Sequence, residues 1–213
     1  MSFLLANYIS SYYTIFNYKF TVDNLRYKGT VTNCMSNENN RIGNWMITYT
    51  GLKFYIIDPR PEDIDIRDIA HGLSLICRFN GQCKKFYSVA QHSLYVTDQV
   101  PNELKLQALM HDASEAYIAD IISPAKKYLT GYAEIENKIM ATIGNKFGFN
   151  WPMDQKVAEA DGRILLNERD WLTNNSEIWN TKYIAYPNLS YVEISSIEAE
   201  NNFLNKFYSL QSN

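Results

Sequence analysis

The chain has 213 residues, of which 46% are hydrophobic and 20% are charged, and its formal net charge is −3. This composition excludes an intrinsically disordered chain, because burial of so many apolar side chains can offset the conformational entropy lost on folding. The net negative charge disfavours a long polyanion as the main partner, so no nucleic-acid binding is expected.

Residues 1–45 are rich in tyrosine and asparagine and show neither a helical nor a strand period. We interpret them as a weakly ordered N-terminal extension, or as translated sequence before a true start at Met35 or Met46; a short strand pair packed on the domain is the alternative. From Thr48 to Asp58, β-branched and aromatic residues surround one glycine, which predicts a small β-hairpin near residues 48–58.

The rest of the chain is predicted to be helical. Apolar residues recur at helical spacing after the turn that contains Pro61, and Ser195 with Glu198 has the spacing of a capping box that begins a last helix. The helices are expected at 63–78, 88–99, 102–119, 131–147, 153–172 and from Ser195 to about Leu210. We therefore expect an all-α fold with a main domain over 46–175 and a C-terminal segment, 176–213, with a terminal helix.

The three cysteines, Cys34, Cys77 and Cys83, are a sparse and odd-numbered set, which favours reduced thiols over a disulfide framework. The amino end lacks the basic region and the continuous apolar stretch of a secretory signal. No window approaches the roughly 20 apolar residues of a membrane span. We therefore expect a cytoplasmic protein that does not enter the membrane.

Two of the three histidines lie in surroundings that suit a metal ion. Glu115 follows His111 by four residues and Asp112 by three on an expected helix, so the three side chains can point to one side. They lie between apolar residues, where an uncompensated charge is costly and a bound cation would offset the cost. Taken alone, a His-Asp pair is more often a surface or capping pair than a metal site.

Two further ligand candidates lie on other expected helices. His92 stands early in the helix over 88–99, and Asp161 stands beside the apolar face of the helix over 153–172. The simpler explanations are a hydrogen-bonded core histidine for His92 and an exposed acid for Asp161.

The order His92, His111-Asp112, Asp161 resembles the H…HD…D signature of the HD-domain phosphohydrolases. The chain is similar to the branch that includes bacterial 5′-deoxynucleotidases and phage dATP triphosphohydrolases. The similarity extends beyond the ligands, from roughly Thr48 to Trp171, through the stretches 77–81, 86–93, 109–117 and 120–126. It implies an HD-domain helical bundle that hydrolyses a phosphate bond of a nucleotide.

The resemblance also implies one divalent metal ion, bound by His92, His111, Asp112 and Asp161, with positions left for water and a phosphate oxygen. Cobalt, manganese, iron, zinc and magnesium all stay open, and magnesium suits two imidazoles least. A single ion is expected because only His71 remains as a further histidine, and we interpret His71 as a structural or supporting residue.

Other positions take their roles from the same resemblance. Glu115 and Asp120 would orient the attacking water or transfer protons, Arg78 would contact phosphate, Phe79 would flank the sugar or base, and Lys126 would neutralise phosphate. Phe79 stands where many relatives have tryptophan, so the base stays open. A solvated side chain is the alternative for Lys126.

Gln91 and Ser93 flank His92. They would either hold this histidine through hydrogen bonds or contribute only to packing.

The predicted function is metal-dependent hydrolysis of a small-molecule nucleotide, as a 5′-deoxynucleotidase or as a triphosphohydrolase of a dNTP, dATP among them. A homo-oligomer is expected, because homo-oligomers are common among the resembling proteins. The alternative is a catalytically silent, nucleotide-binding regulatory module on the same scaffold.

Overall fold

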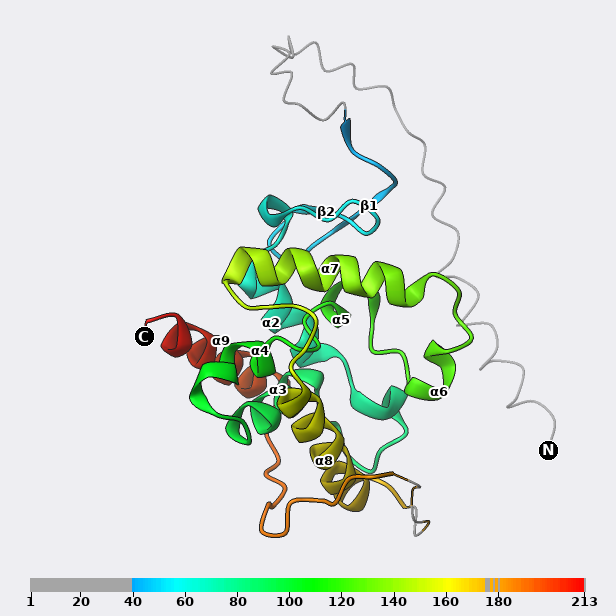
Figure 1. Cartoon of the computed structure of the whole chain (residues 1–213), viewed down its shortest axis with the longest axis vertical. Coiled ribbons are helices and arrows are strands. Elements are labelled where there is room, and N and C mark those ends of the chain that lie inside the picture. The colour runs from blue at the N-terminus through cyan, green and yellow to red at the C-terminus, as the bar shows by residue number, and fades with distance from the viewer. Residues whose placement is uncertain (1–39, 175–176, 178, 180, 213) are drawn as a thin grey trace, which may run out of the picture. The chain divides into compact units, whose positions relative to one another are not determined.

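In the computed structural model, residues 40–174, 177, 179 and 181–212 are described, and the statements below concern these residues. Most of the expected N-terminal extension, residues 1–39, lies outside them. Eight α-helices are described, which confirms the all-α prediction (Figure 1). They are α2 (Ile66–Leu75), α3 (Val89–Asp98), α4 (Lys105–Leu109), α5 (Glu115–Ile118), α6 (Ser123–Lys126), α7 (Tyr132–Phe147), α8 (Gln155–Leu172) and α9 (Ser196–Gln211).

An antiparallel hairpin precedes the helices and is formed by β1 (Trp45–Ile47) and β2 (Lys53–Tyr55). The hairpin is confirmed, but it begins and ends about three residues earlier than the predicted range. Phe54 of β2 is fully buried and stacks on Tyr117 of α5, with 3.8 Å between the ring centroids. This aromatic pair joins the hairpin to the helical core.

Residues 40–45 are the described end of the expected extension, and they are tied to the folded unit. The Arg41 guanidinium lies 3.0 Å from Asp58 Oδ2, donates to the Asp58 carbonyl at 2.8 Å, and also pairs with Asp63. These bonds hold the chain before β1 against the turn that follows β2.

The helix starts follow from side-chain caps. Ser88 accepts a hydrogen bond from the Gln91 amide at the start of α3, and Asp154 accepts one from the Lys156 amide at the start of α8. Such caps satisfy amides that have no partner inside the helix. The capping box of Ser195 and Glu198 is present at α9, as predicted.

The prediction of a single helix over 102–119 is wrong. A 3₁₀ turn at Asn102–Leu104 leads into α4, this helix ends at Leu109, and α5 begins only at Glu115. The Ser114 amide donates to the Met140 sulfur of α7 at 3.3 Å instead of continuing the helix. Asp and Ser side chains compete with helical hydrogen bonds, so the sequence between α4 and α5 favours a turn.

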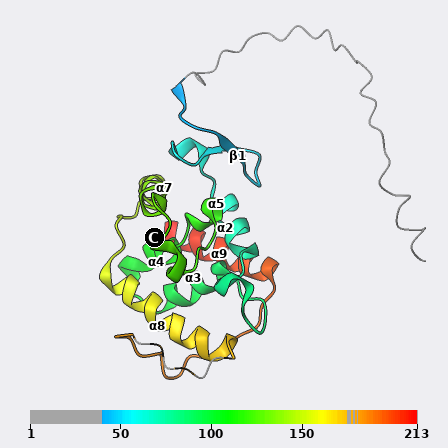
Figure 2. The same ribbon diagram turned by 90° about the vertical axis from the view of Figure 1, so that its right-hand side faces the viewer.

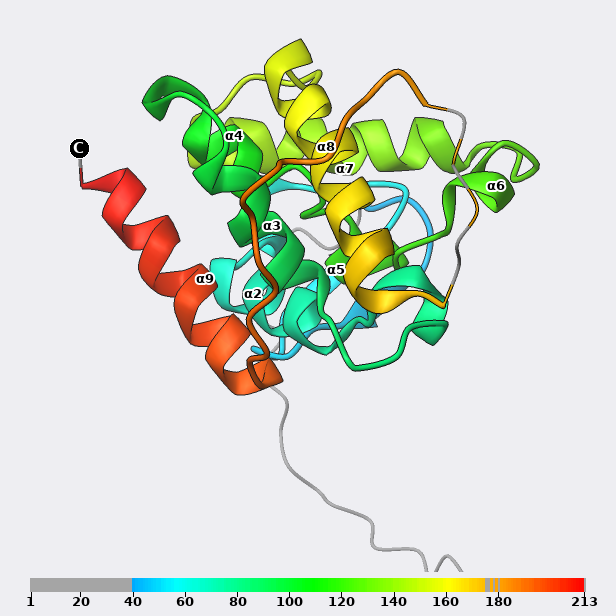
Figure 3. The same cartoon turned by 90° about the horizontal axis from the view of Figure 1, so that it is seen from below.

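Two apolar clusters position the helices. The larger includes buried residues of α2, α5, α7 and α9, whose arrangement Figure 2 shows. The smaller joins α3 and α4 to α8 through fully or almost fully buried residues that include Val96, Ala108, Val157, Ala160 and Ile164. Figure 3 shows α8 beside α3. The smaller cluster therefore fixes the two helices that carry His92 and Asp161.

None of the described helices has both the length and the apolar character needed to cross a membrane.

Candidate metal centre

His92 of α3 is fully buried, and its ring is held by Glu168 of α8. His92 Nδ1 lies 2.6 Å from Glu168 Oε1. Burial raises the pKa of Glu168, but Arg78 and His92 outweigh burial and hold that pKa below its usual range. The ionised carboxylate can only accept, so Nδ1 of His92 donates and its Nε2 is left to face the opposite side.

His111 is held in a similar way in the turn between α4 and α5. Its Nδ1 lies 2.7 Å from the carbonyl oxygen of Ala108, which can only accept a hydrogen bond. His111 Nε2 lies 3.2 Å from His92 Nε2. Two imidazole nitrogens at this separation need a cation or a shared proton between them, since two lone pairs repel each other.

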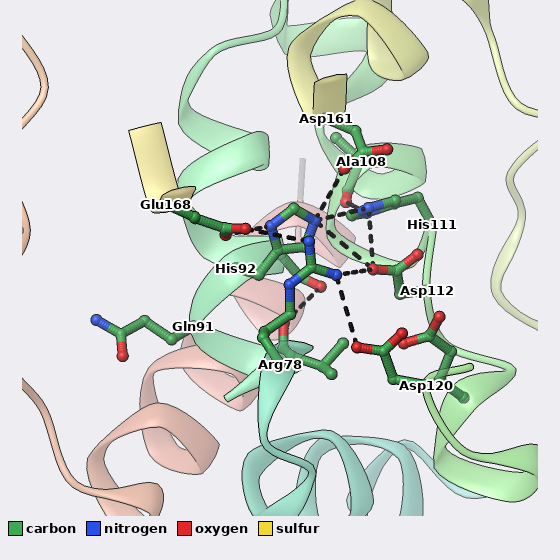
Figure 4. Close-up of polar contacts among 12 residues, drawn as sticks. Arg78, Gln91, His92, Ala108, His111, Asp112, Asp120, Asp161 and Glu168 are labelled. Atoms are coloured by element: carbon green, nitrogen blue, oxygen red, sulfur yellow. Dashed lines mark hydrogen bonds and ion pairs between the residues drawn. The ribbon is translucent and has the colours of Figure 1, made fainter. Parts of the chain in front are cut away.

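Asp161 of α8 completes a cluster with the two histidines (Figure 4). Asp161 Oδ1 lies 3.2 Å from His92 Nε2. One ligand atom from each of His92, His111 and Asp161 lies within 4.8 Å of the others. Imidazole nitrogen and carboxylate oxygen are common ligands of divalent transition metals, so this cluster can hold a metal ion.

Asp112 lies directly beside the cluster. Its Oδ2 is 3.2 Å from His111 Nε2 and 3.6 Å from His92 Nε2, and it is buried without a hydrogen-bond partner. Burial raises the pKa of Asp112, but His111, His92 and Arg78 outweigh burial and hold that pKa well below its usual range. An ionised and unsatisfied oxygen at this place fits a fourth metal ligand.

Arg78 lies among carboxylates in the 3₁₀ turn Arg78–Gly81. The guanidinium is 3.1 Å from Glu168, 3.7 Å from Asp112 and 3.9 Å from Asp120. Burial lowers the pKa of Arg78, but these carboxylates raise it well above its ordinary value. The expected phosphate-binding residue therefore lies beside the cluster, with its positive charge already shared by acids.

Phe79 is half-buried, and the Arg78 guanidinium lies 5.9 Å from the centre of its ring. Phe79 and Asn80 adopt left-handed φ angles of 56° and 53°. The contact with Arg78 connects this aromatic ring to the cluster, and the role of Phe79 toward a sugar or base stays a prediction.

Glu115 lies at the start of α5, buried, with Oε2 lacking a hydrogen-bond partner. Burial, Asp112 and Asp120 raise its pKa well above the ordinary value, against the opposing effect of Lys126. Burial also raises the pKa of Asp120. Glu115 can therefore carry a proton at a pH where an exposed glutamate is ionised.

Lys126 of α6 is tied between two carboxylates. Its Nζ lies 3.5 Å from Glu115 Oε1 and 2.8 Å from Glu136 Oε1, and 30% of the side chain is exposed. The lysine therefore contacts the predicted acid–base residue, which a freely solvated side chain would not do.

Glu168 is the site residue that the sequence did not single out. It follows Asp161 by seven residues, about two helical turns, so both side chains face the same way from α8. The sequence could have indicated Glu168, because it is a second acid at this spacing from Asp161 on a helix with an apolar face.

Three polar residues that the sequence placed near the site have other partners. Gln91 points away from the cluster in Figure 4 and donates to the Val192 carbonyl at 2.6 Å, whereas Ser93 donates to the Val89 carbonyl. His71 Nδ1 lies 3.1 Å from Glu200 Oε2. These contacts assign structural roles to all three.

The fold and the site define a mostly helical protein with a His and Asp cluster that can hold a metal ion. The chain is 46% identical over 122 residues to the uncharacterized protein YfdR of Escherichia coli K12, a match that covers 57% of this chain and 68% of YfdR. The chain therefore belongs to the same family as YfdR.

A second relative is the uncharacterized protein RCAP_rcc00048 of Rhodobacter capsulatus. It is 38% identical over 114 residues, which cover 49% of this chain and 58% of that protein. No protein-family model matches the chain.

Proposed function

We propose that the protein is a metal-dependent phosphohydrolase of the HD-domain type that acts on nucleotides. The observation that carries the proposal is the pair of His92 and His111, whose Nε2 atoms face each other at 3.2 Å while both Nδ1 atoms are occupied. The carboxylates of Asp161 and Asp112 lie against the same two nitrogens. A structural core pair would have no need of four such groups at one point.

The four side chains would hold one divalent cation through two nitrogens and two carboxylate oxygens. When bound, the cation supplies Lewis-acid polarisation of a phosphate oxygen and makes a water molecule more acidic. The mixed ligand set is compatible with cobalt, manganese, iron, zinc or magnesium.

Glu115 and Asp120 are the proposed groups for proton transfer. Glu115 is buried, its pKa is raised, and Lys126 lies against its Oε1, so the carboxyl can hold a proton to transfer at a pH where an exposed glutamate is ionised. Arg78 lies 3.7 Å from Asp112 and 3.9 Å from Asp120, so its guanidinium connects Asp120 to the ligand cluster.

Arg78 is proposed to contact the phosphate after exchanging one of its carboxylate partners. A guanidinium has five donors, so it can keep Glu168 and still offer donors to a phosphate oxygen. Phe79, next to Arg78, would flank the sugar or the base. A homo-oligomer and a cytoplasmic location stay predictions.

One observation favours a second candidate function, a metal-binding regulatory module without turnover. Arg78 and Lys126, the two cations expected to bind phosphate, are both paired with carboxylates. In a silent module these pairs would be permanent, and nucleotides would bind without being hydrolysed.

A panel of dNMPs and dNTPs with each of several divalent metals separates these functions. Orthophosphate from a monophosphate identifies a 5′-nucleotidase, and triphosphate from a dNTP identifies a triphosphohydrolase. Nucleotide binding without any product would favour the silent module.

Variants of the site make the assay specific. His111→Ala and Asp161→Ala should abolish metal-dependent turnover. The matched controls are His71→Ala, which removes a histidine paired with Glu200, and Glu159→Ala, which removes a more exposed acid from α8. Substantial activity in His111→Ala or Asp161→Ala would refute the proposed site.

A further inference from the structure

Cys77 and Cys83 bring two thiols into contact outside the metal cluster. Their Sγ atoms are 3.5 Å apart, and both residues are half-buried free cysteines. Cys77 is anchored, because it forms an isolated antiparallel bridge with Ser88 and the next amide, that of Arg78, donates to the Tyr87 carbonyl at 2.9 Å.

The turn between the two cysteines produces this contact. Phe79, Asn80 and Gly81 all have positive φ angles, and the Gln82 amide donates to the Phe79 carbonyl at 2.9 Å. This tight reversal returns the chain to Cys77 after six residues. Phe79 and Asn80 adopt a conformation that is costly for residues with a Cβ, so the surrounding structure must hold this turn in place.

We propose that Cys77 and Cys83 form a dithiol modification site, at which a low-molecular-weight disulfide such as oxidised glutathione converts the two thiols into an intramolecular disulfide. The sulfurs need to approach from 3.5 Å to the S–S bonding distance of about 2.05 Å. The residues that flank Cys83, Gly81, Gln82, Lys84 and Lys85, are exposed, so no packed side chains of theirs oppose this short approach to Cys77.

The exchange proceeds in two balanced steps. The thiolate of Cys77 attacks one sulfur of the small disulfide, which forms a mixed disulfide and releases one small thiol. Cys83 then gives up its proton and attacks the Cys77 sulfur, which forms the protein disulfide and releases the second small thiol. The protein loses two protons and two electrons, and the small disulfide gains them as it becomes two thiols.

The environment of Cys83 fits the second step. Burial and the neighbouring Cys77 raise the pKa of the Cys83 thiol to about 11, and its Sγ lies 2.9 Å from the Lys85 carbonyl. Cys83 is therefore held as a protonated thiol, which is a poor first nucleophile but lies ready beside the mixed disulfide on Cys77.

The disulfide would close a ring that contains Arg78, which contacts Asp112 at 3.7 Å and Glu168 at 3.1 Å. Oxidation would therefore change the affinity of the ligand cluster for a metal ion. This coupling rests on the proposed metal centre, whereas formation of the disulfide does not.

The test uses the full chain with Cys34→Ser, so that Cys77 and Cys83 are its only thiols. After equilibration in a glutathione redox buffer and alkylation of the remaining thiols, trypsin cuts after Arg78, between the two cysteines. The expected product is peptide 68–78 joined to peptide 79–84, from a chain that has lost two hydrogens and carries no glutathione. Dithiothreitol should reverse the change.

Cys83→Ser in the same background should instead carry glutathione on Cys77. The proposal is overturned if the two-cysteine chain takes up glutathione at each cysteine separately, or stays reduced in a buffer that oxidises the urea-unfolded chain.

Titration of the oxidised and reduced chains with manganese tests the coupling. A difference in dissociation constant supports it. Equal constants overturn the coupling alone, and absence of manganese binding by the reduced chain counts against the metal centre and leaves the dithiol site standing.

Discussion

His92 Nε2 and His111 Nε2 lie 3.2 Å apart in the protein interior, and the Nδ1 atom of each ring is bonded to a different acceptor. Burial and Arg78 lower the pKa of His92, but Glu168 and Asp161 outweigh them and raise it to about 10. In the metal-free chain, His92 is therefore protonated on Nε2 as well as on Nδ1, and the Nε2 proton lies between the two rings.

Metal binding should release this proton. Below pH 10 the ion must displace it to reach the Nε2 lone pair of His92, so metal affinity should rise with pH, with about one proton released per ion. Titration calorimetry in two buffers of different ionisation enthalpy measures the number. Binding at pH 7 without proton release would contradict the arrangement.

The same shift predicts how the metal-free fold responds to pH. The folded-state pKa of His92 lies above the unfolded value of about 6.5, so its contribution to stability is fully present below pH 6.5 and is lost as pH rises through about 10. Urea unfolding across this range, with His92→Asn as the comparison, measures the loss. A wild type that loses no more stability than His92→Asn would contradict it.

Glu168→Gln should weaken both the fold and the metal site. Arg78 loses a fully buried ionic partner, and breaking such a pair costs about 3–5 kcal/mol. The His92 ring also loses the carboxylate that orients it, which typically costs about 10- to 100-fold in metal affinity. Urea unfolding and a metal titration measure the two effects.

Asp170→Asn is the control for this change, because Asp170 lies on the same helix, is largely exposed and pairs only with the adjacent Arg169 among the ion pairs described. If the two variants had equal stability and equal metal affinity, Glu168 would have no role in the site.

Glu115→Gln should stabilise the fold while it abolishes turnover. The folded-state pKa of Glu115 is raised, so ionisation of this carboxyl opposes folding once the pH exceeds the unfolded value of about 4.3. The gain in free energy of unfolding should be present at pH 7 and shrink as the pH falls toward 4. Unfolding curves at the two pH values, with an activity assay, give both readouts; lower stability at pH 7 would contradict the explanation.

Ala119→Gly should stabilise the protein by about 1 kcal/mol. Ala119 has φ 68° and ψ 156°, in a region that only glycine adopts freely and that costs other residues of the order of 1–3 kcal/mol. The greater freedom of glycine in the unfolded chain offsets part of the gain. Gly131→Ala is the reverse control, since Gly131 has φ 82° and open space for a Cβ; it should lose stability. Urea unfolding measures both changes.

Part of the candidate metal cluster was predictable because histidine is rare in this chain. His92 and the His111-Asp112 pair include two of its three histidines, and Asp161 stands beside an apolar helix face. The structure brings His92, His111 and Asp161 together. Sequence spacing could not show that Asp112 Oδ2 is left without a hydrogen-bond partner, because that depends on what packs around it.

The sequence failed where tertiary contacts override local preference. Apolar periodicity over 102–119 predicted one helix, yet the Ser114 amide bonds to Met140 of α7 and the chain turns before Glu115. Glu168 was missed for a related reason, since its partners His92 and Arg78 lie more than 70 residues away in the sequence. Caps are local, so Ser195 with Glu198 was predicted correctly.

The measurement that tests the central claim most directly is the amount of divalent metal bound per chain at equilibrium, by dialysis against manganese or cobalt and elemental analysis. His111→Asn and Asp161→Asn are compared with the controls His71→Asn and Glu159→Gln. We predict one ion per chain in the wild type and in both controls, and none in the two site variants. Equal metal content in all five proteins, or none in the wild type, would contradict the proposed metal centre.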